Sequence, residues 1–151
     1  MFIDSFFTII SKFYHNRISL YSKNLDFNNL IDIGTHKGEF LESFLKIKKI
    51  KKFYCFEPQK KIYDNLKKIF VKKNKIKLYN YALGDTCLNK KIYINSLTST
   101  STLSKFNHRS KYLKFKNFLT GTDLKNQTSY LVNQKTIDKV FKKISLKKTF
   151  M

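Results

Sequence analysis

Short apolar runs, separated by polar segments, organise the first half of the chain. The runs at 30–33 and 52–56 are rich in Ile, Phe and Tyr, which is typical of buried strands. Four apolar residues then recur at helical spacing and predict a helix over 60–70: Ile62, Leu66, Ile69 and Phe70. A third strand is expected near 75–81. Strands that alternate with helices indicate the α/β class.

The second half is less regular. Residues 91–95 alternate, which predicts a strand returning antiparallel beside the third strand. The segment 97–107 is rich in Ser and Thr and is expected to be a loop. A short strand is predicted at 130–132, followed by a short helix over 138–144 that Thr136 would cap.

Residues 1–29 are expected to form an amphipathic helical segment that packs on a single domain formed by residues 30–151. Apolar residues recur there at near-helical spacing, with basic residues interleaved: Phe6, Phe7, Ile9, Ile10, Phe13 and Tyr14. The stretch is too short and too interrupted to cross a membrane. Contact with a membrane surface is the alternative to packing on the core.

The turn after the first predicted strand carries the candidate chemistry. Asp32 ends the strand, and Gly34 and Gly38 follow in a D-x-G-x-x-x-G pattern. Such a turn lies where open α/β sheets bind nucleotide-like ligands. It lacks the intermediate glycine of dinucleotide-binding turns, and its carboxylate favours a cationic ligand. Glu57 ends the next strand at nearly the spacing of about 20 residues typical of a ribose-binding acid.

Five segments resemble the FkbM family of S-adenosylmethionine-dependent methyltransferases: Ile31–Phe40, Phe56–Pro58, Tyr81–Asp85, Ser101–Leu103 and Lys135–Asp138. The resemblance implies a class I, Rossmann-like, doubly wound sheet that binds S-adenosylmethionine. It further implies that the cofactor is held by Asp32, Gly34, Thr35, Gly38 and Glu57, with Tyr81 and Ala82 beside the adenine. Ser101 and Thr102 would border the active site. Family members methylate hydroxyl groups of sugars and other small molecules.

The chain departs from the family pattern near Lys147, where a further strand would begin. We therefore expect a sheet that is incomplete in its C-terminal half and lacks the acid nearest the reacting methyl group. No catalytic residue is assigned. A non-catalytic fragment that only binds the cofactor is the alternative. An exposed sheet edge would lead to marginal stability or self-association.

Composition adds one further alternative. The 151 residues carry a net charge of +21, which is typical of proteins that bind nucleic acid or anionic membranes. Only Arg17 and Arg109 are arginine, although arginine is preferred for phosphate recognition. A codon bias that favours lysine explains the charge better, so a basic RNA-binding module ranks last. The two cysteines and three histidines have no metal-ligand spacing, and a reducing cytoplasm is expected.

Overall fold

The computed structural model describes residues 2–94, 103, 110, 111, 115 and 128–151, with side chains from residue 9 on. The predicted loop at 97–107 lies outside the described residues except for Leu103, and so do Ser101 and Thr102.

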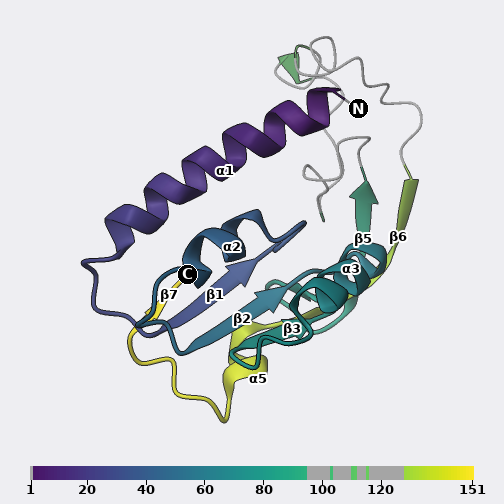
Figure 1. Cartoon of the computed structure of the whole chain (residues 1–151). Helices are drawn as coiled ribbons and strands as arrows, with labels where there is room; N and C mark the ends of the chain where they lie inside the picture. The colour runs from purple at the N-terminus through teal and green to yellow at the C-terminus, as the bar shows by residue number, and fades with distance from the viewer. Residues whose placement is uncertain (1, 95–102, 104–109, 112–114, 116–127) are drawn as a thin grey trace.

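A parallel four-stranded sheet in the order β3-β2-β1-β7 forms the centre of the molecule (Figure 1). Its strands are β1 (Asn29–Ile33), β2 (Lys52–Phe56), β3 (Ile76–Tyr79) and β7 (Thr149–Phe150). Helices α2 (Glu39–Leu45) and α3 (Lys60–Phe70) connect the first three strands. The α/β class and the first three strands are therefore confirmed, and α3 has the bounds that its apolar stripe predicts.

Alternate residues of the central strands point to two different cores. On one face, Leu30, Phe53 and Cys55 are buried with apolar side chains of α2 and α3. On the other face, Tyr54 and Phe56 pack with Phe141 of α5 (Ile137–Phe141). Helices thus cover both faces of the sheet, and both acids of the predicted site lie on the face that α2 and α3 cover.

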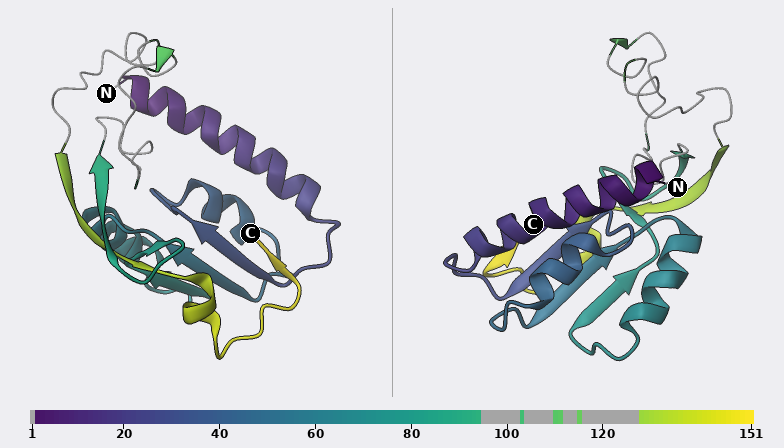
Figure 2. Two further views of the ribbon diagram at one scale, coloured as in Figure 1. Left: turned by 180° about the vertical axis from the view of Figure 1, so that it is seen from behind. Right: turned by 45° about the horizontal axis from the view of Figure 1, so that its top comes forward.

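The predicted partner of the strand near 91–95 is wrong. This strand, β5 (Asn89–Ile94), runs antiparallel to β6 (Thr128–Lys135) and does not pair with β3. Figure 2 shows β5 and β6 side by side. The far end of β6 pairs parallel with β4 (Ala82–Leu83), giving a second sheet in the order β4-β6-β5. The partner of β5 comes from a distant part of the sequence, so local alternation could not identify it.

The cap of α5 is confirmed. The Thr136 hydroxyl accepts a hydrogen bond from the backbone N–H of Lys139, at 3.3 Å. This contact satisfies one of the free amides at the start of the helix. The helix begins one residue before the predicted range and ends three residues earlier, at Phe141.

The N-terminal helix α1 (Phe2–Ser22) packs against α2, on the side of α2 away from the sheet (Figure 1). Lys12 pairs with Glu42 of α2 at 3.7 Å, and the ring of His15 meets that of Phe40 edge-on. The expected burial of the apolar residues is wrong for Ile9, Ile10, Phe13 and Tyr14, which are exposed. The helix faces the domain with a different set of residues from the one that the spacing predicts.

A short strand follows Lys147 and adds to the parallel sheet. Its two residues, β7, pair parallel with Asn29 and Leu30 of β1. Phe150 stacks on Phe27 and Phe44, with ring centroids 5.1 Å and 5.6 Å apart.

Among the described residues, no helix has both the length and the apolar character that crossing a membrane requires.

Candidate functional site

The turn between β1 and α2 contains three residues in the left-handed region: Gly34 at φ 79°, His36 at φ 50° and Gly38 at φ 89°. Two of its amides continue the hydrogen bonding of β1 to β2. The backbone N–H groups of Gly34 and Thr35 both donate to the Phe56 carbonyl, at 2.9 and 3.1 Å. The turn is therefore held at the carboxyl edge of the parallel sheet, where the sequence places it.

The two glycines of the turn have different surroundings. A Cβ added at Gly34 would meet no atom within 4 Å, whereas one at Gly38 would lie 3.0 Å from the Phe70 ring and 3.2 Å from Leu66. Gly38 thus lets α2 begin close against α3. Gly34 leaves open space over the backbone, which is what a ligand that approaches the main chain needs.

We expect Gly38→Ala to lower the free energy of unfolding more than Gly34→Ala. Both substitutions force alanine into a left-handed conformation, at a cost of about 1–2 kcal/mol. Only Gly38→Ala adds a clash inside the core, for a total of about 2–4 kcal/mol. Urea unfolding of both variants measures the difference. Equal losses would show that the close packing at Gly38 is not rigid.

Glu57 joins the ends of the first two strands. Its Oε2 accepts the backbone N–H of His36 at 2.9 Å, and its Oε1 accepts that of Gln59 at 2.8 Å. The residue is only 2% exposed. Burial raises the pKa of Glu57, and the two amide hydrogen bonds oppose that rise. Each carboxylate oxygen can accept a second hydrogen bond, so the acid can still bind a hydroxyl-bearing ligand.

Asp32 is the second acid of the site and is 7% exposed. Its Oδ2 is buried and has no hydrogen-bond partner. Asp32 lies opposite Cys55 in the β1–β2 register. Cys55 is two residues before Glu57, and residues two apart on a strand share a face, so both acids lie on the same face of the sheet. Burial raises the pKa of Asp32 to about 7; hydrogen bonding from Thr35 opposes this, while the charges of Glu57 and Glu39 add to it.

A third acid, Glu39, begins α2 beside the turn. His36 Nδ1 lies 3.5 Å from its Oε1. Burial raises the pKa of Glu39, but the hydrogen bond from His36 and the neighbouring charges together lower it. In the part of the chain that the structure describes, no group of three or more His, Cys, Asp or Glu residues could hold a metal ion.

Tyr81 and Ala82 lie apart from the acids. Tyr81 packs on Phe56, with ring centroids 5.6 Å apart, and Lys135 Nζ lies 4.3 Å from the centre of its ring. Burial raises the pKa of Tyr81 to about 12. Ala82 belongs to a separate cluster in the second sheet. Their neighbour Asn80 also contacts the site, because its side-chain amide donates to the Glu57 carbonyl at 2.9 Å.

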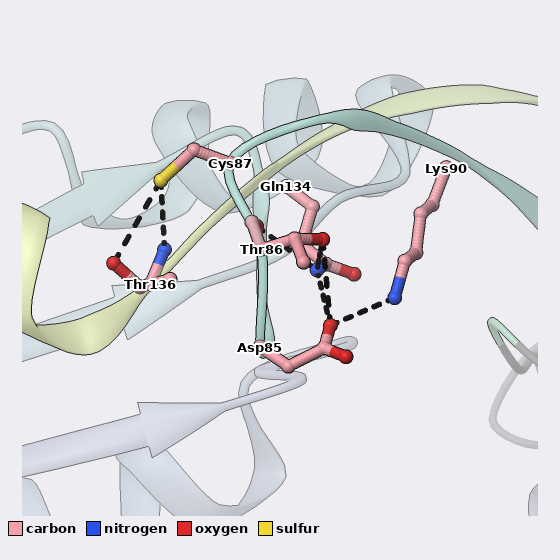
Figure 3. Close-up of polar contacts among 6 residues, drawn as sticks. All are labelled: Asp85, Thr86, Cys87, Lys90, Gln134 and Thr136. Carbon is pink, nitrogen blue, oxygen red and sulfur yellow. Dashed lines mark hydrogen bonds and ion pairs between the residues drawn. The ribbon is translucent and has the colours of Figure 1, made fainter.

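The neighbouring Leu83-Gly84-Asp85 segment has a structural role. A Cβ at Gly84 would lie 2.4 Å from the Gln134 side chain. The Gln134 amide donates to the Asp85 carboxylate, the Thr86 carbonyl and the Thr86 hydroxyl, each at 3.0 Å (Figure 3). Lys90 also pairs with Asp85, and these contacts lower the pKa of Asp85 to about 2. Gly84 and Asp85 therefore fix β4 to β6.

Several contributors to the site were not predicted. His36 bridges Glu57 and Glu39, through its backbone amide and its ring respectively. Gln59 and Asn80 hold Glu57 from two further directions. The sequence signal for Gln59 is its place two residues after a strand-end acid, within reach of the carboxylate. No comparable pattern in the sequence predicts that His36 adopts a left-handed backbone conformation.

No protein-family model matches the chain, and no curated protein matches it. Among solved structures, it is similar to the crystal structure of the methyltransferase FkbM from Methylobacillus flagellatus KT, at 18% sequence identity and a TM-score of 0.38. The match covers 42% of this chain and only 19% of that methyltransferase chain. A likeness of this strength decides neither the cofactor nor the reaction, so the proposals below rest on the geometry of the turn after β1.

Proposed function

We propose that the chain binds S-adenosylmethionine at the turn after β1 and serves methyl transfer to a hydroxyl group of a sugar or another small molecule. One observation carries this proposal: the buried Asp32 carboxylate, which has an unpartnered oxygen, lies on the same face as Glu57 and beside a turn with open space over Gly34.

The properties of this turn suit the cofactor's chemistry. An unpartnered buried carboxylate oxygen needs a donor or a positive charge, and S-adenosylmethionine has both an ammonium and a sulfonium group. The remaining acceptor positions of Glu57 suit the two ribose hydroxyls. Gly34 allows the ligand to approach the main chain. Tyr81 offers an aromatic ring for the adenine, and its neighbour Asn80 donates to the Glu57 carbonyl.

In this proposal the chain contributes binding and orientation. The sulfonium supplies an activated methyl group when the cofactor is bound, so the protein must align an acceptor oxygen and exclude water. Asp32 would hold positive charge near the turn, and Glu57 would fix the ribose. No described residue is assigned as the base that deprotonates the acceptor.

Calorimetry with S-adenosylmethionine tests the binding part of the proposal. We expect saturable binding to the wild-type chain and its loss in Gly34→Val, because the added side chain fills the space left for the ligand. Gly84→Ala, in the second sheet, adds a Cβ that clashes with Gln134 and shows whether a disruptive substitution elsewhere has the same effect. Unchanged binding in Gly34→Val would contradict the site.

Transfer of a labelled methyl group to a panel of sugars and small alcohols tests the catalytic part. Binding with transfer supports a methyltransferase. Binding without transfer to any acceptor would support the non-catalytic alternative.

A further inference from the structure

From residue 9 on, helix α1 turns its polar side toward the domain and its apolar side toward solvent. The residues that face the domain are mostly small or polar: Ser11, His15, Ile18, Ser19 and Ser22. Ser19 and Ser22 are buried, and each donates its hydroxyl hydrogen bond back to a carbonyl of α1 itself. Among residues 9–22 of α1, Ile18 packs against the main core and the ring of His15 meets Phe40, so burial against the domain does not account for the apolar residues of this part of the helix.

The solvent-facing side is continuous and strongly apolar. Six large residues recur along it at helical spacing and are exposed: Ile9, Ile10, Phe13, Tyr14, Leu20 and Tyr21. Phe13 is 66% exposed and Tyr21 73%. Monomeric soluble proteins rarely leave so large an apolar strip uncovered without a function for it.

Positive charge accompanies this strip. From Ile9 to Leu25 the sequence contains Lys12, Arg17 and Lys23 and no acidic residue. All three basic residues are exposed; Arg17 lies among the apolar residues on the outward side, whereas Lys12 pairs with Glu42 of α2. Lys49 lies at the end of the helix, where its ammonium group donates to the Lys23 carbonyl at 2.6 Å.

We propose that the outward side of α1 docks on an anionic lipid surface. An in-plane amphipathic helix combines large apolar residues, aromatics and basic residues in this way, and anionic headgroups attract each nearby Lys or Arg. Charge favours lipid over a second copy of the chain, because two copies that each carry +21 repel one another. The proposal is independent of the cofactor.

Vesicle flotation of the full chain tests the proposal. The wild-type chain is expected to float with vesicles of phosphatidylcholine mixed with phosphatidylglycerol, and much less with phosphatidylcholine alone. Partitioning should fall as salt is added, because the attraction of exposed charges is screened. Replacing two outward residues, Ile9→Ser with Phe13→Ser, should weaken partitioning about tenfold or more because it removes apolar area that would enter the bilayer.

The matched control places a similar change at the C-terminal end of α3 and on Val71, the residue that follows it. Ile69 and Val71 are 59% and 70% exposed, so Ile69→Ser with Val71→Ser removes exposed apolar area from another face and should leave partitioning unchanged. Thermal unfolding by circular dichroism establishes that both double variants fold. Equal weakening by the two double variants, or no flotation of the wild-type chain, would overturn the proposal. A wild-type dimer that becomes monomeric only in the α1 variant would assign the strip to a second copy instead.

Discussion

Replacing Glu57 with alanine is expected to abolish measurable S-adenosylmethionine binding and to lower the free energy of unfolding by roughly 2–6 kcal/mol. Two backbone N–H groups, those of His36 and Gln59, would lose their acceptor in a buried region, and each such group costs about 1–3 kcal/mol. The turn after β1 would keep its backbone bonds to Phe56 but lose the carboxylate that joins it to the turn after β2, so the ligand-binding surface would be less ordered as well as lacking an acid.

Glu42→Ala is the matched control for this change. Glu42 is also a glutamate near the same turn, but its side chain is 49% exposed and its partner Lys12 is 3.7 Å away. An exposed pair of this kind contributes about 0–1 kcal/mol. Calorimetry at a temperature where circular dichroism shows a folded Glu57→Ala variant separates binding from stability. Retained binding in that variant would remove Glu57 from the proposed site.

Asp32→Asn is expected to stabilise the ligand-free chain above neutral pH. In the folded state the pKa of Asp32 is raised from 3.8 to about 7, first of all by burial. Between these values the unfolded chain has lost its proton while the folded chain retains it, so the wild-type chain loses stability as the pH rises from 4 to 7. The full loss is about 4 kcal/mol, at about 1.4 kcal/mol per pKa unit.

Urea unfolding of the wild-type chain and of Asp32→Asn at several pH values measures this effect. The advantage of the asparagine variant should be small at pH 4, grow up to pH 7 and stay constant above it. The same variant should bind S-adenosylmethionine more weakly, because it has no negative charge to offer. An advantage that does not change with pH would show that Asp32 is better solvated than its burial indicates.

Sequence patterns predicted the elements whose structure depends on residues close together in the chain. The apolar stripe of 60–70 gave the bounds of α3, and Thr136 correctly marked the start of α5. The strand-end acids and the glycine turn could likewise be located, because chain reversal between a strand and a helix requires residues such as Gly34. These features depend on neighbours within a few positions.

Features that depend on distant contacts were not predicted. The strand β5 pairs with residues of β6 that lie far along the sequence. The hydrogen bond from the His36 amide to the Glu57 carboxylate joins residues 21 positions apart, so it forms only when the turn after β1 is folded. The predicted orientation of α1 was wrong. An apolar stripe shows that a helix has an apolar and a polar side, but it does not show which side meets the domain.

The pairing of β7 with the start of β1 also determines when the chain can finish folding. Asn29 binds the carbonyl of Lys147, 118 positions away, and the edge of the parallel sheet is closed by Phe150. During synthesis the ribosome releases the N-terminal residues first, so this edge of β1 stays unpaired until Thr149 and Phe150 emerge. Contacts of such high sequence separation slow folding, and a chaperone that shields β1 during translation would protect the protein from aggregation.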